Sequence, residues 1–310
     1  MDLALLAVAA VWGGVTGLLI PRAAYRFAVD PEEPWHTACP AGHAFTGRLG
    51  GWLGPARCTS CVPRAQASVR YGDEGDASVP PDGHEGGASV PPYGGERKTS
   101  MPPHGDENAA SVSPYGPERE APTARPPHPA SYAPGTLAPL ITVLTCLALA
   151  AATGPRPELA AWLLLAPPAV LLATVDRRVH RLPDPLTLPL AAAAVLLLGA
   201  AALLPGHAGS WTSGLLGGLV LGGFYLLLFL INPDGMGFGD VKLALALGVA
   251  LGWYGWEVLF LGGFAGFLFG AAYGLGLVLL RRAGRKTGIP FGPFMIAGAL
   301  VGVLLGALAA

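Results

Sequence analysis

Long apolar runs, each close to the length needed to cross a lipid bilayer, recur along almost the whole chain. A transmembrane helix needs about 20 predominantly apolar residues. Only 13% of the residues are charged, against roughly 25% in an ordinary soluble domain. The sequence therefore predicts an all-α, polytopic membrane protein with about eight transmembrane helices. The predicted spans are roughly 3–20, 136–153, 158–175, 186–204, 211–231, 240–255, 257–280 and 291–309.

The basic residues beside these spans favour one orientation, with both chain ends outside the cell. Cytoplasmic loops of membrane proteins carry an excess of Lys and Arg. The short outer loops contain Arg156 as their one basic residue. The first run has Asp2 where a signal peptide would be basic, so we interpret that run as a span. On the predicted cytoplasmic side lie Arg177, Arg178, Arg181, Lys242, Arg281, Arg282, Arg285 and Lys286.

A polar region separates the first two spans. Its second part repeats an imperfect unit of about eleven residues, as in ASVPPDGHEGG and ASVPPYGGERK, with few large aliphatic side chains. Such a segment cannot bury enough apolar surface to offset its ordering entropy. Its Pro-Pro pairs also exclude a continuous helix. We expect a first transmembrane helix at 1–20, a cytoplasmic Cys/His segment at 21–66, a largely disordered cytoplasmic insert at 67–135, and a seven-helix membrane core at 136–310.

Two aspartates lie at span ends on the predicted cytoplasmic face. Asp176 ends the run AWLLLAPPAVLLATVD, and Asp240 follows the glycine-rich loop NPDGMGFG. Each has an ordinary structural interpretation, Asp176 as an interfacial charge and Asp240 as a helix cap. Asp184 resembles an N-cap residue with Pro185 at the first helical position. Two carboxylates at membrane depth are nevertheless costly unless the protein uses them.

A close pair of carboxylates favours one kind of chemistry. Two adjacent negative charges cannot both form cheaply, so the pair shares a proton. The ionised group then acts as a base toward water, while the protonated group donates to the carbonyl oxygen of a peptide bond, as in aspartic proteases. In the sequence, no Ser/His/Asp or Cys/His set competes for this role.

Three strings in the second half of the chain form a recognisable set. They are VDRRVHRLPDPLTLP (175–189), GMGFGDVKLALALG (235–248) and GIPFGPFMIAG (288–298). In composition and order they resemble the prepilin peptidases, or type IV leader peptidases, which are membrane aspartic proteases of the GxGD type. The resemblance covers residues 136–310 and, loosely, the first span.

The resemblance implies roles for individual residues. Asp176 and Asp240 would be the catalytic dyad, and cleavage would need no cofactor. Gly237 and Gly239 would let the loop approach the substrate backbone. For Lys242 three interpretations stay open: an anchor for the loop, a charge that tunes Asp240, or an interfacial lysine whose charged end reaches the membrane surface.

The resemblance also implies substrates and a location. The substrates would be type IV prepilin or pseudopilin precursors, whose leader is removed at the cytoplasmic face of the plasma membrane. The protein would be a multi-pass membrane protein surrounded by lipid, and pilus or secretion assembly proteins are possible partners. The net charge of −1 argues against a nucleic-acid partner.

The cysteines depart from the pattern of the longer family members, which carry two CxxC pairs between the first two spans. Here one pair is present as Cys58 and Cys61, while Cys39 is followed by PAGH. With His43 these residues would make a Cys₃His zinc set, and His36 is an alternative ligand. The other interpretation is a set of free thiols. The altered module argues against the N-methyltransferase activity of bifunctional members.

Two other functions are compatible with parts of the sequence. A non-enzymatic transporter would also suit glycine-rich spans, but transporters usually show polar residues near the middle of the membrane. The spans here are nearly free of such residues. The second alternative is a GxGD peptidase that cleaves another membrane substrate, such as a preflagellin. The PFGP string and the cysteines favour a prepilin substrate over a preflagellin.

Overall fold

The chain divides into two units, one formed by Met1–Val62 with Pro129–Ala310 and the other by Pro63–His128. The structure, a computed structural model, describes residues 2–29, 33–55, 57–58, 60–61, 137–233, 235–280 and 290–310, all in the first unit. The predicted insert at 67–135 and the basic residues between 281 and 286 lie outside the described residues.

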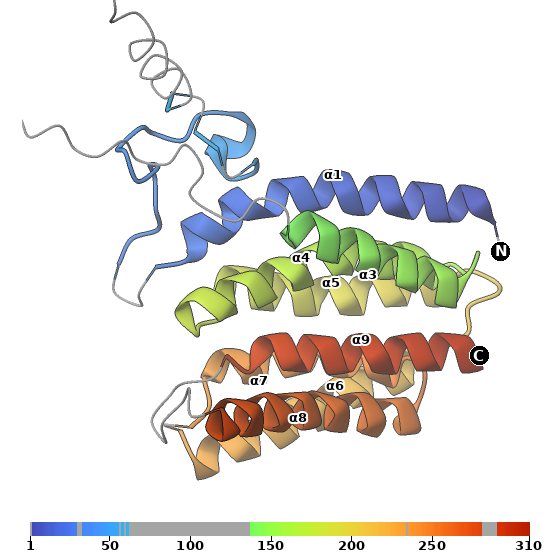
Figure 1. Cartoon of the computed structure of the whole chain (residues 1–310). Coiled ribbons are helices and arrows are strands. Elements are labelled where there is room, and N and C mark those ends of the chain that lie inside the picture. The colour runs from blue at the N-terminus through green and yellow to red at the C-terminus, as the bar shows by residue number, and fades with distance from the viewer. Residues whose placement is uncertain are drawn as a thin grey trace, which may run out of the picture. The chain divides into compact units, whose positions relative to one another are not determined.

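The described residues form eight α-helices, one short 3₁₀ helix and no strand, as the apolar runs predict (Figure 1). Six of these helices are long and apolar enough to cross a membrane. The other two, α3 and α7, have 17 and 15 residues. The elements are α1 (Leu3–Phe27), η1 (Arg48–Gly51), α3 (Leu137–Thr153), α4 (Glu158–Val179), α5 (Asp184–Ala202), α6 (Trp211–Ile231), α7 (Phe238–Gly252), α8 (Trp256–Leu279) and α9 (Gly292–Ala309).

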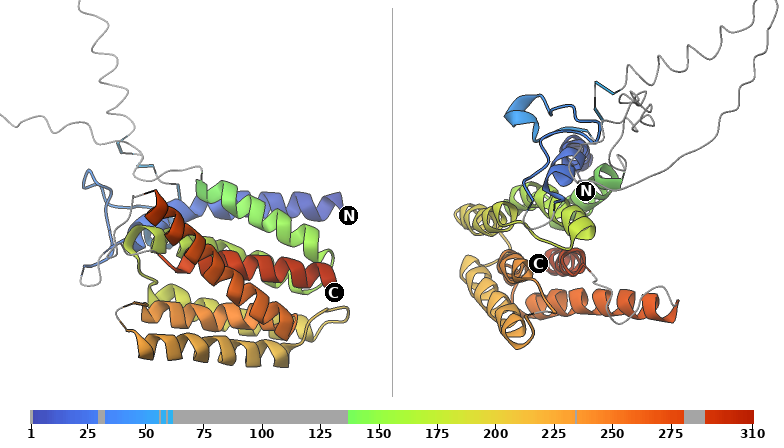
Figure 2. Two further views of the ribbon diagram at one scale, coloured as in Figure 1. Left: turned by 60° about the horizontal axis from the view of Figure 1, so that its bottom comes forward. Right: turned by 90° about the vertical axis from the view of Figure 1, so that its left-hand side faces the viewer.

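The helices run side by side, with consecutive helices in opposite directions (Figures 1 and 2). Both chain termini therefore lie at the same end of the bundle, as an even number of membrane passes requires. The starts of α3, α5, α7 and α9 all lie at the other end, which we call the aspartate end because it holds Asp176 and Asp240. The end with the termini is called the opposite end.

Helix α7 is the most enclosed helix of the described bundle. Most of its side chains are buried, including Val241, Leu243 and Leu251. It packs closely on α6, because glycines of both helices meet at the contact. A Cβ atom on residue 217 would lie only 2.6 Å from the carbonyl oxygen of Gly248. We call this contact, formed by Gly214, Gly217 and Gly218 of α6 with Gly248 and Gly252 of α7, the glycine seam. Small residues of this kind allow membrane helices to approach closely.

Helix α1 is longer than its apolar run, which the sequence analysis ends at residue 20, and it continues to Phe27. The extension is held by contacts that hydropathy does not report. The guanidinium of Arg26 lies 3.8 Å from the ring centre of Trp52 and donates to the carbonyl of Gly50 at 2.9 Å. The end of α1 thus becomes the support for the polar segment that follows.

Candidate active site and metal site

Asp176 is placed at the aspartate end by the last turns of α4 and is 4% exposed. The backbone N–H of Gly292, at the start of α9, donates to Asp176 Oδ2 at 2.9 Å. A Cβ atom on residue 292 would lie 2.8 Å from the same oxygen. A glycine at this position therefore allows the backbone to reach the carboxylate, and α9 fixes the direction in which Asp176 points.

Asp240 lies in the first turn of α7 and is 8% exposed. The backbone of Gly237 interacts with its carboxylate, and the Asp240 N–H donates to the Gly237 carbonyl at 3.0 Å. These contacts are typical of an acidic residue near a helix start. Asp240 therefore stabilises the start of α7, and this role is compatible with a catalytic one. Asp176 is close enough to act electrostatically on Asp240.

Both aspartates line one cavity of about 500 Å³, which we call the aspartate cavity. It also includes His180 and Lys242, and its walls come from the α4–α5 loop, the α6–α7 loop and the start of α9. The lining includes exposed side chains such as Arg181, so the cavity reaches the surface. The structure thus brings together residues from all three sequence strings, and both carboxylates line the same cavity.

The two glycines predicted to admit the substrate backbone differ in their surroundings. A Cβ atom on Gly237 would meet nothing closer than 3.8 Å, so this residue leaves open space in the aspartate cavity. A Cβ atom on Gly239 would lie 2.7 Å from the Cβ of Leu182, in the α4–α5 loop. Gly239 therefore makes room for a loop of the protein itself, which ties the start of α7 to the end of α4.

Leu182 is a positioning residue that the sequence analysis missed. It is 6% exposed, and a Cβ atom on Gly292 would also lie within 3.5 Å of its side chain. The chain reaches this position through His180, which has a left-handed backbone (φ 50°) and donates its N–H to the Asp176 carbonyl at 2.8 Å. The RLPD string contains Leu182, but only the fold shows that it contacts both other strings.

Lys242 forms an ion pair between two helices. Its Nζ donates to Asp184 Oδ1 at 2.6 Å and lies 4.9 Å from the ring centre of Phe238. The ion pair joins the starts of α5 and α7. Asp184 was predicted to be an N-cap, but α5 begins at Asp184 itself and its N-cap is Pro183. The Asp184 side chain does not cap the helix and instead accepts from Lys242.

The Cys/His segment brings its four predicted ligands together. The ligand atoms of Cys39, His43, Cys58 and Cys61 all lie within 4.8 Å of one another. The Nδ1 of His43 lies 3.6, 3.7 and 3.3 Å from the three sulfurs, and the sulfurs of Cys39 and Cys61 are 3.9 Å apart. Tetrahedral zinc with ordinary bond lengths requires separations of about 3.6 Å for N···S and about 3.8 Å for S···S.

The chemistry of the donor set also fits a metal. Burial, and then the neighbouring thiols of Cys58 and Cys39, raise the pKa of Cys61 to about 12, and a bound cation would offset the charge of its thiolate. The alternative ligand His36 instead stacks on Tyr25, with ring centres 4.6 Å apart, and it is not in the cluster. The segment can therefore hold a metal through these four side chains.

The fold and site together define a class: an all-helical, multi-pass membrane protein with two carboxylates in one cavity at the helix ends. Comparison with known proteins agrees with this class. The type IV leader peptidase family matches residues 163–275, which include both aspartates. The match covers about a third of the chain and makes this part similar to that family.

Several curated relatives share the name prepilin leader peptidase/N-methyltransferase. The protein from Aeromonas hydrophila is 37% identical over 174 residues, which cover 55% of this chain and 58% of that relative. For Pseudomonas aeruginosa the identity is 35%, over 47% of this chain and 49% of the relative. For Bacillus subtilis it is 36%, over 34% and 42%. The matches thus span 42–58% of the length of these three relatives. No solved structure gives a significant match.

Proposed function

We propose that the protein is a membrane aspartic endopeptidase that removes the leader from type IV prepilin or pseudopilin precursors. The observation that carries the proposal is the common cavity of Asp176 and Asp240, which are 64 residues apart in the chain (240 − 176). The family match over residues 163–275 and the names of the relatives support the substrate class. The transporter interpretation receives no such support.

The mechanism follows from two carboxylates that share one proton. The ionised aspartate removes a proton from a water molecule, whose oxygen then attacks the carbonyl carbon of the peptide bond. The protonated aspartate donates to the carbonyl oxygen. When the C–N bond breaks, a proton passes to the leaving amine, and the pair returns to its shared-proton state. Gly292 and the backbone of Gly237 orient the two carboxylates through the contacts described above.

The aspartate cavity is proposed to face the cytoplasm. Arg177, Arg178 and Arg181 lie beside Asp176 at the aspartate end, while Arg156 lies at the opposite end. This distribution is the one expected when the aspartate end is cytoplasmic. The basic leader of a precursor would then remain on the side where cleavage occurs, and its following apolar segment would lie in the membrane beside the protein.

The test is leader removal from a co-expressed pilin-like precursor, followed by gel shift. Asp176→Asn and Asp240→Asn should each reduce cleavage by at least about a thousandfold, since each removes one half of the acid–base pair. Glu257→Gln, which changes an exposed acid at the start of α8, is the matched control and should cleave normally. Cleavage at the normal rate by either asparagine variant, at equal protein level, would refute the mechanism.

We also propose that Cys39, His43, Cys58 and Cys61 hold a structural zinc ion. All four positions of a tetrahedral site would be filled by protein ligands, so the metal would stabilise the segment and supply no open coordination site for catalysis. Purified protein should contain about one zinc per chain, as expected for a single Cys₃His site. Cys58→Ser should lose the zinc, whereas Cys146→Ser, a buried cysteine of α3, should keep it. Equal zinc in both variants would exclude the site.

The N-methyltransferase activity in the relatives' names is a separate question. We propose that this chain cleaves without methylating, because the first cysteine pair of the module is replaced by Cys39 and His43. Mass spectrometry of the mature precursor, after co-expression, reads cleavage and methylation from the same molecule. An unmethylated N-terminus is expected, and a methylated one would overturn this part of the proposal.

A further inference from the structure

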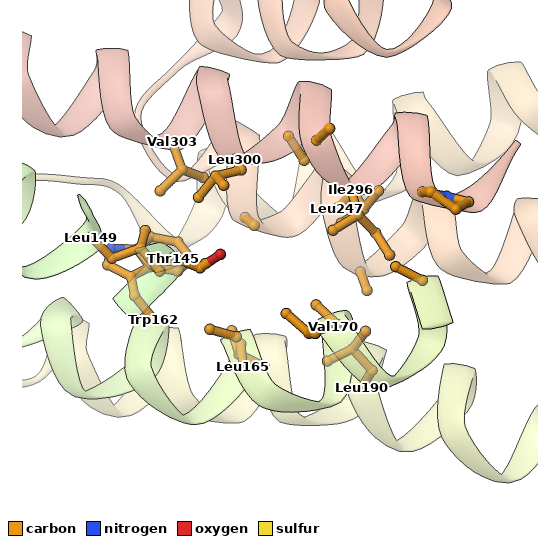
Figure 3. A pocket seen from close by; sticks show the side chains of 18 of the residues that line it. Thr145, Leu149, Trp162, Leu165, Val170, Leu190, Leu247, Ile296, Leu300 and Val303 are labelled. Carbon is orange, nitrogen blue, oxygen red and sulfur yellow. The ribbon is translucent and has the colours of Figure 1, made fainter. Parts of the chain in front are cut away.

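A second cavity, of about 310 Å³, lies between the two helices that carry the aspartates. We call it the apolar cavity, because almost all of its lining side chains are aliphatic or aromatic. Figure 3 shows Leu165 and Val170 of α4 on one side, facing Ile296, Leu300 and Val303 of α9 on the other. Helix α7 contributes Ala246, Leu247 and Ala250.

The apolar cavity runs from the aspartate end toward the opposite end. Trp162 and Val303 line it far from the aspartates, whereas Arg177 and Pro293 line it at the aspartate end. Arg177 and Ile141, near the end of α4 and the start of α3, are exposed. The cavity therefore reaches the surface at this end, where Arg177 is the charged residue of its lining.

The size and lining restrict what can occupy this space. A buried water molecule needs two to four polar partners, and the lining offers few. The volume of about 310 Å³ and the apolar lining suit a stretch of one alkyl chain, and the surrounding bilayer supplies such chains.

The charge at the mouth restricts the occupant further. A guanidinium group binds phosphate oxygens through paired hydrogen bonds. Phospholipid phosphates lie at the membrane surface, at the depth where a helix end such as that of α4 emerges. We propose that the apolar cavity binds one acyl chain of an anionic phospholipid, whose phosphate is held by Arg177.

Bound lipid would touch both elements that orient Asp176. Arg177 follows Asp176 on α4, and Pro293 follows the Gly292 that donates to it. The acyl chain would also fill the space between α4 and α7, the helices that carry Asp176 and Asp240. An effect of this lipid on cleavage rests on the proposed function, but the binding itself does not.

The experiment measures lipid binding to the full chain by native mass spectrometry, with dioleoyl phosphatidylglycerol added to delipidated protein. One lipid per chain should remain bound at low concentration. Arg177→Gln should weaken binding about tenfold by removing the charge-assisted contact. Ala166→Leu, which adds bulk to the lining, should weaken it at least about tenfold.

Two matched controls lie on the same helix outside the apolar cavity. Arg178→Gln removes a neighbouring charge, and Ala160→Leu adds the same bulk at an exposed position. Both should bind lipid as the unmodified chain does. Equal binding by Arg177→Gln and Arg178→Gln would overturn the proposal, and this comparison stays valid if Ala166→Leu does not fold.

A final pair of measurements distinguishes a bound lipid from bound inorganic phosphate and from a bound pilin-like precursor. Inorganic phosphate at the same concentration should not displace the lipid, because it has no acyl chain; displacement would overturn the proposal. A pilin-like precursor should leave the lipid in place, and its displacement would assign the cavity to the substrate. If the unmodified chain cleaves the precursor but binds no lipid, this inference fails and the proposed function stands. If Arg177→Gln loses the lipid and cleaves normally, only the effect of the lipid on cleavage is removed.

Discussion

The two ends of the helical bundle are built in opposite ways. At the opposite end, side chains close the structure: Trp162 of α4 donates to the hydroxyl of Tyr254 just after α7, and Arg156 donates to the carbonyl of Ala307 in α9. At the aspartate end, the same helices surround an open cavity with charged and polar walls. The helices that carry the two aspartates are thus joined at one end and accessible at the other.

This difference suggests that one end of the bundle mainly stabilises the fold and the other mainly positions the two carboxylates. The hydrogen bonds at the opposite end should contribute to stability, because polar groups buried in a membrane protein gain from having partners. Contacts at the aspartate end are made through glycines and one leucine, which set the positions of the carboxylates. Substitutions at the two ends should therefore affect different measurements.

The largest effect is expected at the contact between α9 and Asp176. In Gly292→Ala the new methyl group would lie 2.8 Å from the carboxylate oxygen, so the carboxylate must move. A displacement of about 1 Å can cost about a hundredfold in rate, and we expect at least that loss in the cleavage assay. Gly276→Ala in α8, where a Cβ atom would meet nothing within 4 Å, is the control. Normal cleavage by Gly292→Ala would remove this contact from the mechanism.

A smaller effect on the cleavage rate is expected for the two glycines before Asp240, and the two can be compared directly. Gly239→Ala places a methyl group against Leu182, and overpacking of this kind costs about 1–3 kcal/mol. We expect cleavage to fall about tenfold as the start of α7 shifts, consistent with that energy. Gly237→Ala faces open space and should change the rate less than about threefold. Initial cleavage rates at equal protein level measure both, and a larger loss for Gly237→Ala would reverse the assigned roles.

At the opposite end the expected change is in stability. Tyr254→Phe removes the acceptor for Trp162 and should lower the free energy of unfolding by about 1 kcal/mol. Because the aspartate end is untouched, cleavage at low temperature should stay within about twofold. Thermal melting in detergent, followed together with the cleavage rate, measures both quantities. A large loss of cleavage without a change in melting would contradict the division between the ends.

The smallest effect is expected for the ion pair between Lys242 and Asp184. Asp184 is 59% exposed, and exposed ion pairs contribute less than about 1 kcal/mol. Lys242→Met should shift the melting temperature slightly, and Lys242→Arg, which keeps the charge, should reverse part of that shift. The contribution should shrink in high salt, which screens exposed charges. A salt-independent loss would point to the packing of the lysine stem on Phe238 instead.

Hydropathy predicted the helices because membrane insertion depends on local composition. All eight predicted spans are confirmed as helices, with boundaries a few residues different. The main difference, the extension of α1 to Phe27, comes from the packing of Arg26 on Trp52, a contact between residues 26 positions apart (52 − 26). Such contacts leave no local pattern, so the sequence analysis ends the helix where the apolar residues end.

The sequence predicted the two aspartates of the candidate site, but it did not predict the contacts of Gly292 and Leu182 that position them. Asp176 and Asp240 are unusual at span ends, and a carboxylate pair has a known chemistry. The role of Gly292 depends on α9 returning beside α4, and that of Gly239 depends on Leu182 crossing to α7.

For the Cys/His segment, the C-x₂-C and C-x₃-H spacings predicted a metal set but left His36 open as an alternative to His43. The fold distinguishes them, because His36 stacks on Tyr25 and His43 lies among the cysteines.

The glycine seam between α6 and α7 has a consequence for sequence variation. An alanine is as acceptable to lipid as a glycine, yet at Gly217 or Gly248 the added methyl group would meet main-chain atoms that cannot rotate away. Tolerance to mutation in this stretch should therefore follow contact geometry, and an algorithm that scores only apolar character would miss the positions where one carbon atom separates a functional helix pair from a displaced one.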